Sequence, residues 1–384
     1  MPVITTPTFG DLIRQHRTTK ELTLNKLSDL TGINKGTISK IENGEVKKPE
    51  FRTLKIIAEA LQIPYETYLI LYIEAEKSPD VISNILNDAI KEKRSIHIIT
   101  QIASKFLETE RLDSYDATTQ LFNSTQSQVN SELQLALYKT IINYSRGHGV
   151  MPYLARSLFQ EYLIERNNFS KLKDTYPSGK YILKYKDLLP PGEYVTLLYC
   201  LMVHSYVIRE HEDCVSYCQA LLVNKEEEAV KVRTYAIDYL RGSHYHLGNY
   251  ELAEKYAEEY RKYVPSIGST NDRLITAMIN AKRGKVELAV EQFEKCLQLC
   301  NDGFTVHIVT EYISLCLAHD QMNKIPNLLL TYESKILEQP YTTPMEKNEV
   351  ARFYKLKGDY YTEVNDIIQA IRNYIKGAYA YAYK

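Results

Sequence analysis

The side chains best suited to binding a charged partner lie close together near the start of the chain. Asn34, Lys35, Thr37 and Lys40 fall within one short segment. The lysines can contact phosphates or guanine edges, Thr37 can contact a thymine methyl group or a phosphate, and Asn34 offers an amide. These groups on one helix could contact DNA, but the surrounding motif must carry that interpretation. Gly36 presents no side chain in the same segment, which favours contacts with DNA backbone and shape over direct base contacts.

Cysteine and histidine residues form the next candidate site. Cys200 and His204, and likewise Cys214 and Cys218, are four residues apart, so each pair would share one face of a helix. Zinc sites usually place their ligands around turn residues, so buried thiols are the favoured interpretation of these pairs. The sequence also lacks a P-loop, a glycine-rich dinucleotide turn and the H-E-x-x-H and G-x-S-x-G motifs. We therefore expect no metal, no cofactor and no enzymatic activity.

Five short helices are expected to position the segment 34–40. Thr8, Thr23 and Asn34 can each cap a helix, because a side-chain oxygen there can accept a hydrogen bond from a first-turn amide. Gly32 can end the second helix, since glycine adopts a positive φ at little cost. The second and third helices, of about nine residues with a short turn between them, have the dimensions of a helix-turn-helix. The alternative is a small helical bundle whose charges are only solvated.

The segment 27–44, followed by Pro49 and an apolar helix over 54–61, resembles the phage-repressor (XRE-type) helix-turn-helix family. The match is most specific at Ile41-Glu42-Asn43-Gly44 and covers about residues 8–72. The family often has glutamine where this chain has Leu24, so one phosphate contact is missing from the pattern. The positions that the resemblance places on DNA are Asn34, Lys35, Gly36, Thr37 and Lys40, and those that it places in an internal ion pair are Arg17 and Glu42.

Composition indicates a folded chain of more than one domain. The 384 residues are 44% hydrophobic, include six cysteines and carry 47 Lys/Arg against 48 Asp/Glu. Residues 1–68 hold ten Lys/Arg and eight Asp/Glu, an excess too small to indicate DNA binding without the motif. No segment approaches the ~18 apolar residues of a membrane span, and no basic segment precedes an apolar one at the start. We therefore expect a cytoplasmic protein with reduced thiols.

Internal repeats are evident in the second half of the chain. The pattern Gly-x-aromatic/apolar-x-x-Ala occurs from Gly248 to Ala253 and again, 36 residues later, from Gly284 to Ala289. A further copy fits residues 358–374. These copies resemble the tetratricopeptide (TPR) repeat, which implies paired antiparallel helices.

The two parts together predict an all-α protein. A five-helix helix-turn-helix domain is expected over residues 1–72, and a TPR-like right-handed α-solenoid of about seven to nine hairpins over residues 73–384. Proline and glycine in the stretches 176–179 and 190–192 are expected to interrupt this solenoid.

A solenoid of this kind presents a concave face that can hold an extended peptide or a partner helix. Arginine there could bind a carboxylate, and asparagine could hold a peptide backbone by donating and accepting together. Most of the 32 tyrosines are expected to pack between repeats instead. By their repeat positions, the groove-facing candidates for peptide binding are Arg209, Tyr235, Asp238, Tyr239 and His246, with Asn280 nearby.

A phage-repressor DNA domain joined to TPR repeats, in this order and at this length, resembles the Gram-positive peptide-pheromone receptors called RRNPP. The resemblance implies a cytoplasmic homodimeric transcription regulator that binds double-stranded DNA and is gated by a short signalling peptide in the TPR groove. Whether the peptide promotes or releases DNA binding stays open. Two alternatives also stay open: a DNA-tethered TPR adaptor for a protein partner, and a protein that sequesters a signalling partner as the Rap-type relatives do.

Overall fold

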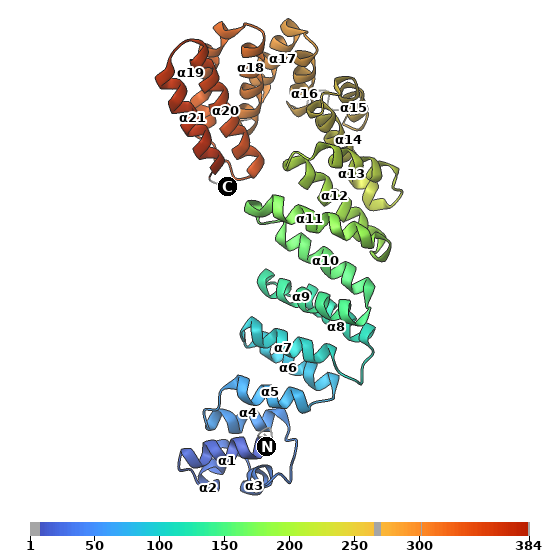
Figure 1. Cartoon of the computed structure of the whole chain (residues 1–384), viewed down its shortest axis with the longest axis vertical. Helices are drawn as coiled ribbons and strands as arrows, with labels where there is room; N and C mark the ends of the chain where they lie inside the picture. Colours follow the sequence, from blue (N-terminus) through green and yellow to red (C-terminus); the bar gives the residue numbers. More distant parts are fainter. Residues whose placement is uncertain (1–7, 265–269, 301, 383–384) are drawn as a thin grey trace, which may run out of the picture. The chain divides into compact units, whose positions relative to one another are not determined.

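The computed structural model describes residues 8–264, 270–300 and 302–382, and the regular elements in these ranges are all helices (Figure 1). The predicted all-α class is therefore confirmed. Two compact units make up the chain, Met1–Glu161 and Tyr162–Lys384. Across the described ranges, no helix is both long enough and apolar enough to cross a membrane.

The first unit begins with a bundle of five short helices. Their buried sides include Ile13, Leu27, Ile38 and Leu54, which are fully buried. Apolar residues recur at spacings of three and four in these helices because that spacing keeps one face toward the core. The helices are α1 (Phe9–Thr19), α2 (Leu24–Thr31), α3 (Lys35–Glu42), α4 (Phe51–Ala60) and α5 (Tyr65–Ala75).

Local capping residues determine where the first helices of the bundle begin and end. Thr8 and Thr23 each accept a hydrogen bond from a first-turn amide over 3.2 Å. Asn34 accepts one over 2.8 Å at the start of α3. Gly32 has a φ of +70° and ends α2, so the chain turns before α3 begins. The predicted helix ends around this turn are confirmed.

The first unit continues from α5 as a stack of helices. The predicted domain boundary at residue 72 falls inside α5, which runs on to Ala75 and contacts both α4 and α7. The last helix of the bundle is therefore also the first of the stack. No proline or glycine occurs between Pro64 and Pro79, so the helix is not interrupted at residue 72. The stack contains α6 (Pro79–Lys91), α7 (Ile96–Leu107), α8 (Ser114–Gln126), α9 (Ser131–His148) and the first part of α10 (Met151–Glu165).

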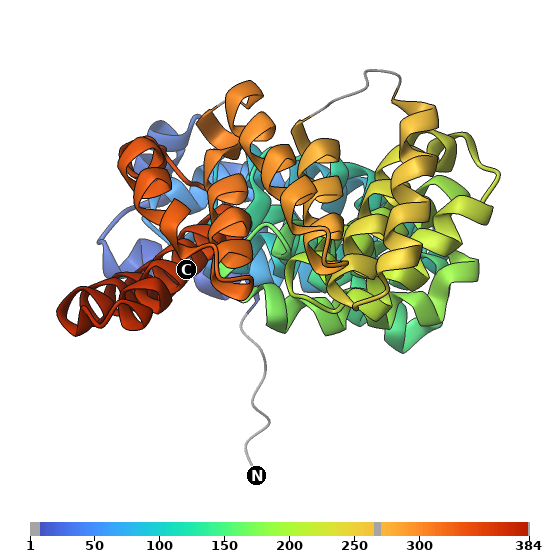
Figure 2. The same ribbon diagram turned by 90° about the horizontal axis from the view of Figure 1, so that it is seen from above.

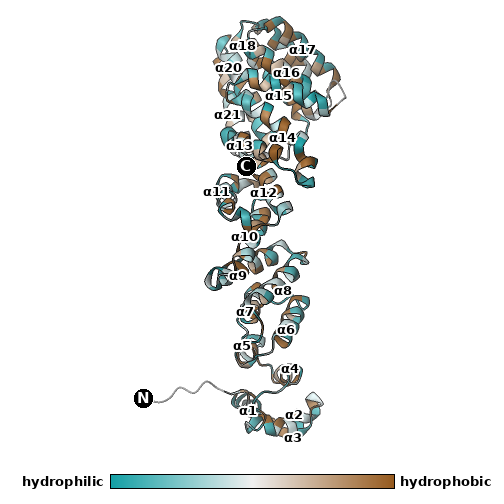
Figure 3. Cartoon of the chain, turned by 90° about the vertical axis from the view of Figure 1, so that its right-hand side faces the viewer, coloured by the Kyte–Doolittle hydropathy of each residue, from teal (hydrophilic) through white to brown (hydrophobic). Residues whose placement is uncertain are grey.

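The helices of the stack are amphipathic. Figure 3 shows hydrophobic and hydrophilic residues on the same helices. In α7 the buried side includes Ile98, Ile102 and Phe106, at spacings of four residues. Such helices are stabilised mainly by packing this side against a neighbour.

The second unit is built from consecutive helices that pack in pairs. Close pairs are α12 with α13, α14 with α15, α16 with α17, and α20 with α21. Figure 2 shows α20 and α21 lying along each other. The helices are α11 (Leu172–Ile182), α12 (Pro191–Val207), α13 (His211–Val223), α14 (Glu227–His246), α15 (Tyr250–Tyr263), α16 (Thr270–Lys282), α17 (Val286–Leu299), α18 (Thr305–Ala318), α19 (Ile325–Leu337), α20 (Pro344–Glu363) and α21 (Ile367–Ala382).

The repeated glycine and alanine positions explain this pairing. Gly248 and Gly284 have φ values of +78° and +75° and make the turns between the helices of their pairs. Ala253 and Ala289 are fully buried, where small side chains let neighbouring helices approach. In the third copy, a Cβ atom on Gly358 would lie 2.5 Å from the Tyr374 ring, so α20 and α21 are in close contact there.

One predicted interruption of the second unit is wrong. Pro177 lies inside α11, so the stretch 176–179 continues as helix. Pro177 lacks an amide hydrogen and therefore removes one intrahelical hydrogen bond, but this loss does not end the helix. Pro191, in contrast, stands in the first turn of α12, where proline is well tolerated.

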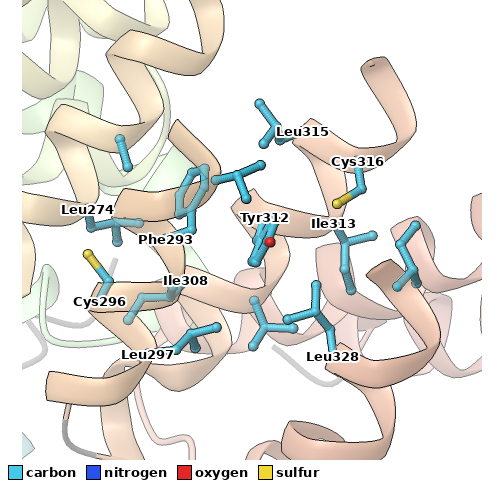
Figure 4. Close-up of a cluster of buried hydrophobic side chains, with 14 of the residues drawn as sticks. Leu274, Phe293, Cys296, Leu297, Ile308, Tyr312, Ile313, Leu315, Cys316 and Leu328 are labelled. Atoms are coloured by element: carbon cyan, nitrogen blue, oxygen red, sulfur yellow. The ribbon is translucent and has the colours of Figure 1, made fainter. Parts of the chain in front are cut away.

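The core of the second unit is well packed between α16, α17, α18 and α19. Phe293 and Tyr312 are almost fully buried, and their rings stack with centroids 5.5 Å apart (Figure 4). Cys296 and Cys316 belong to the same cluster, where burial raises the pKa of each thiol, to about 11 and about 12 respectively. These two cysteines therefore serve as small apolar residues.

Candidate DNA-binding helix and ligand cavity

Helix α3 presents the predicted DNA-contacting residues on one exposed side. Ile38 and Ile41 are buried on the opposite side and attach the helix to the bundle. Lys35 and Lys40 form no ion pair within the described part of the chain, so both ammonium groups are available to an outside partner. The exposed set consists of Asn34, Lys35, Gly36, Thr37 and Lys40.

A buried ion pair fixes the orientation of α3 against α1. Arg17 Nε donates to Glu42 Oε1 over 2.7 Å and its Nη2 donates to Oε2 over 2.8 Å. The remaining Arg17 nitrogen, Nη1, donates to the Leu22 carbonyl over 2.7 Å. The hydrogen bonds that Arg17 donates to the Glu42 carboxylate raise the pKa of Arg17. A bidentate pair with both partners saturated holds its geometry better than a single contact, and it is the pair that the family resemblance implied.

Close backbone contact between α1 and α3 depends on Gly10. A Cβ atom at this position would lie 2.5 Å from the Ile41 carbonyl oxygen and 2.8 Å from that of Glu42. Only glycine allows these helices to approach so closely. Sequence reasoning missed this residue, although a glycine inside a helix, where it costs about 1 kcal/mol, is a usable signal.

Polar contacts attach the helix-turn-helix bundle to the first helices of the stack. Lys48, in the loop after α3, lies 2.6 Å from the carboxylate of Glu76, just beyond α5. Burial by itself would raise the pKa of Glu76, but hydrogen bonds from Lys48 and from the amides of Lys77 and Ser78 lower it overall. The loop next to α3 is therefore tied to the junction between α5 and α6.

A second connection joins α4 to the turn between α6 and α7. Lys55 pairs with Glu92, which also accepts from Arg94 over 2.7 Å. The Arg94 guanidinium lies 4.1 Å from the centre of the Tyr65 ring, a separation at which a cation is attracted to the ring face. Two separate ion pairs, Lys48 with Glu76 and Lys55 with Glu92, thus connect the bundle to the stack.

The second unit contains a cavity of about 530 Å³. Residues from α12 to α16 line it on one side, and residues from α18 and α20 on the other. Its volume is within the ~300–1,000 Å³ that is typical of ligand sites. Its polar and aromatic lining consists of Tyr206, Arg209, His211, Tyr245, His246, Tyr250, Lys282, Glu311, Asn348, Glu349 and Arg352.

The charges of this cavity are unevenly paired. Arg352 donates to both Glu311 and Glu349, the latter over 3.1 Å. Burial raises the pKa of Glu349 to about 7, although Arg352 opposes this shift. Arg209 and Lys282 have no side-chain hydrogen bond or ion pair within the described residues. The cavity therefore has two unpaired positive charges beside one closed ion-pair cluster.

Neutral aromatic rings form one wall of the cavity. His211 and His246 stack with ring centroids 4.6 Å apart, and Tyr206 contacts both rings edge-on. Burial lowers the pKa of His211 and lowers that of His246 to about 4. Both imidazoles are therefore uncharged at neutral pH. The Nδ1 atom of His211 is buried without a hydrogen-bond partner.

Two of the six predicted peptide-binding residues, Arg209 and His246, line this cavity. The other four do not. Tyr239 packs behind the wall, with its ring 4.9 Å from that of Tyr206, and Tyr235 is 55% exposed and contacts Tyr199.

Asp238 and Asn280 are occupied by contacts inside the protein. Asp238 accepts from the buried Arg241 over 2.7 Å, because a fully buried guanidinium requires carboxylate partners. Asn280 is 6% exposed and donates to Gln292 over 3.0 Å. Repeat position placed these candidates on α14 and α16 but did not indicate which of their side chains have partners inside the protein.

Sequence reasoning missed the half of the cavity that comes from later helices. Lys282 ends α16, Glu311 lies on α18, and Glu349 and Arg352 lie on α20. The only local signal was the three-residue spacing of Glu349 and Arg352, which allows an ion pair on one helix face.

The proposed thiol interpretation of the Cys/His pairs agrees with the packing. Cys200, Cys214 and Cys218 are buried. His204 uses both ring nitrogens, with Nδ1 2.9 Å from the Tyr162 hydroxyl and Nε2 2.7 Å from the Leu172 carbonyl. Burial lowers the pKa of His204, so this side chain is a neutral part of the core.

Comparison with known proteins places the N-terminal bundle in a family. Residues 13–67 match the family described as helix-turn-helix. An uncharacterized HTH-type transcriptional regulator of Bacillus subtilis, RghRB, is 35% identical over 95 residues, which are 25% of this chain and 66% of that protein. The HTH-type transcriptional repressor RghR of the same organism is 45% identical over 58 residues, 15% of this chain and 43% of that protein. The chain therefore spans less than two thirds of either relative.

A solved structure was also matched. The crystal structure of Bacillus thuringiensis PlcR with the peptide PapR7 and DNA is 14% identical, with 98% of both chains covered. The TM-score is 0.29, too low for this likeness to bear on fold or function.

Proposed function

Starting from a helix-turn-helix domain at residues 13–67, we propose that this protein is a DNA-binding transcription regulator gated by a short peptide. The observation that carries the DNA part is the exposed side of α3, where Lys35 and Lys40 form no ion pair with any described residue. Both named relatives are described as HTH-type transcriptional regulators, which supports the same function.

The DNA contacts we propose are mainly with the backbone. Helix α3 enters the major groove, with Lys35 and Lys40 near phosphates or guanine edges and Thr37 near a thymine methyl group. Gly36 leaves room for close approach but contributes no side chain. Specificity then depends in part on the shape and deformability of the operator.

The ligand part of the proposal is supported by the cavity of the second unit. It combines an aromatic wall, His211 and His246, with the unpaired cations Arg209 and Lys282. A peptide offers apolar side chains and charged or polar groups together, which suits this lining. A concave site of this size suits a small ligand better than the surface of a folded protein partner.

Gating requires that the peptide bind one state of the regulator better than another. We propose a homodimer that carries two α3 helices, because DNA half-sites recur at about 34 Å, one helical turn, or a multiple of it. A peptide that prefers the DNA-competent or the incompetent dimer by a few kcal/mol shifts the population accordingly.

The test is binding of the purified full chain to DNA flanking its own gene, at a stated salt concentration, with and without short peptides encoded beside that gene. We expect tight binding whose affinity one peptide changes by tenfold or more. The matched variants are Lys35→Ala/Lys40→Ala, expected to lose DNA binding, and Lys91→Ala, which changes an exposed lysine of α6 and should bind normally.

Different results would contradict the two parts of the proposal, DNA binding by α3 and gating by a peptide. Unchanged DNA binding by the double α3 variant would refute the role of α3. DNA binding that is indifferent to every peptide would refute gating and favour the protein-adaptor alternative.

A further inference from the structure

We propose that the cavity of the second unit binds a carboxylate of its peptide ligand, held by Arg209 and Lys282. This inference rests on the proposed function, because it specifies which part of a peptide the cavity receives. The carboxylate can belong to the peptide C-terminus or to an acidic side chain, and the geometry favours the C-terminus for the reasons given below.

The first reason is the distribution of positive charge. Three cationic side chains line the cavity, and Arg352 alone is bonded to carboxylates of the protein, those of Glu311 and Glu349. Among the residues that the structure describes, Arg209 and Lys282 find no acceptor for their side-chain donors. Two unpaired cations that line one cavity attract an anion, and each has donors for hydrogen bonds to it.

The second reason is that the carboxylates of the cavity are already occupied. A cationic ligand group would have to compete with Arg352 for Glu311 and Glu349. Breaking these partly buried ion pairs would leave a displaced charge without its partner, which is unfavourable. An anionic ligand group needs no such displacement. The lining of the cavity therefore favours an acidic group of the ligand over a basic one.

The third reason concerns a backbone group next to the carboxylate. The Oδ1 atom of Asn348, which lines the cavity, is buried without a hydrogen-bond donor. A buried acceptor without a partner is costly, and a ligand N–H would satisfy it. The last residue of a peptide supplies a carboxylate and an amide N–H a few atoms apart, a combination that an isolated anion lacks.

The experiment uses two pools of random hexapeptides on the full chain, one ending in a free carboxylate and one ending in a carboxamide. Peptides retained by the wild-type protein are identified by mass spectrometry, and the dissociation constant of the best one is measured in both terminal forms. We expect the carboxamide form to bind at least tenfold more weakly. A third form, with any acidic side chain changed to its amide, separates the two sources of carboxylate.

The variants assign the carboxylate to the two cations. Arg209→Gln and Lys282→Gln should each weaken the free-acid peptide by about tenfold or more, and should weaken the carboxamide form much less. Lys285→Gln removes an exposed lysine from the same turn region outside the cavity and should change neither. The circular dichroism melting curve of each variant shows that the fold is retained.

The outcomes separate this inference from the function on which it rests. Loss of binding only when acidic side chains are amidated supports the carboxylate site and assigns it to a side chain. Peptides that bind equally in all forms, or that are unaffected by both cation variants, overturn the inference and leave peptide gating intact. A failure of both pools to yield a peptide overturns both.

Discussion

At the scale of single residues, the paired and unpaired charges decide what each part of this molecule can do. Arg17 and Glu42 satisfy each other inside the bundle, whereas Lys35 and Lys40 on the same bundle stay free for a partner. In the described part of the second unit, Arg352 is paired with Glu311 and Glu349, whereas Arg209 and Lys282 form no ion pair. Whether a charged side chain has a partner inside the protein distinguishes structural charges from binding charges more clearly than its residue type does.

Arg17→Met is expected to lower the free energy of unfolding by on the order of 2 kcal/mol, because within the described residues it leaves the buried carboxylate of Glu42 with only the half-exposed Arg14, 3.8 Å away, as an ion partner. The measurement is urea unfolding of the transition that includes α1 to α5. Arg17→Met/Glu42→Leu should recover most of the loss. If the double variant were as unstable as the single one, the loss of stability would not come from the unbalanced charge of Glu42.

Glu349 is expected to make stability depend on pH near neutrality. Burial raises its pKa from 4.5 to about 7, with Arg352 and Arg209 opposing the shift and Glu311 adding to it. The folded state therefore binds a proton more tightly than the unfolded state does. The stabilisation that protonated Glu349 contributes to the folded state is fully present below about pH 4.5. It is lost as the pH rises through about 7.

The variant that tests this dependence is Glu349→Gln, which keeps the hydrogen bond to Arg352 but cannot ionise. Relative to it, the wild-type protein should lose stability between pH 5 and pH 8, by on the order of 2 kcal/mol. Denaturant unfolding of both proteins at the two pH values measures the difference. Parallel pH profiles would show that this carboxyl group titrates normally.

At the scale of elements, glycines decide how closely helices pack. Gly10→Ala should push α1 away from α3, because its Cβ atom would meet two backbone carbonyl oxygens within 3 Å. The change should lower the free energy of unfolding by about 1–3 kcal/mol. It should also weaken DNA binding. The control is Gly147→Ala in α9, where a Cβ meets nothing within 4 Å. That change should stabilise by about 0.5–1 kcal/mol, because alanine is the better helix former. Equal effects of the two changes would contradict the packing argument.

The junction between the bundle and the stack is the second feature at this scale. Glu76→Gln should weaken the contact with Lys48 and the bonds to the Lys77 and Ser78 amides, and hydrogen exchange at these two amides should become about tenfold faster. Hydrogen exchange read by mass spectrometry or NMR measures this change. Glu74→Gln, which alters an exposed neighbour, should leave exchange at both amides as in the wild type. No acceleration in Glu76→Gln would show that the junction is held without this carboxylate.

At the scale of the whole molecule, the expected behaviour is that of a salt-sensitive DNA-binding protein. The logarithm of the affinity should fall linearly with the logarithm of the salt concentration, because phosphate contacts release counterions. In Lys35→Ala/Lys40→Ala the slope should be smaller by about 1.8 per chain, at ~0.9 per phosphate contact. Titrations of residual binding at several salt concentrations give both slopes. An unchanged slope would place the two lysines away from phosphates.

The sequence by itself determined the features that depend on neighbouring residues. Thr8, Thr23 and Asn34 predicted helix starts, and Gly32 predicted a helix end, because capping bonds form within one turn of the chain. The exposed side of α3 followed from the spacing of Ile38 and Ile41. The repeated glycine and alanine positions likewise predicted the helix pairs of the second unit.

Only the tertiary structure decided which side chains meet across long stretches of sequence. Arg209 and Arg352 lie 143 positions apart and line one cavity, whereas Asp238 and Asn280 are taken up by Arg241 and Gln292. The continuity of bundle and stack is also a tertiary feature, since α5 packs against helices of both. Helix periodicity gives the inward face of each helix, but the partner opposite that face depends on how successive pairs are rotated. That rotation is the sum of many side-chain contacts, and no local pattern records it.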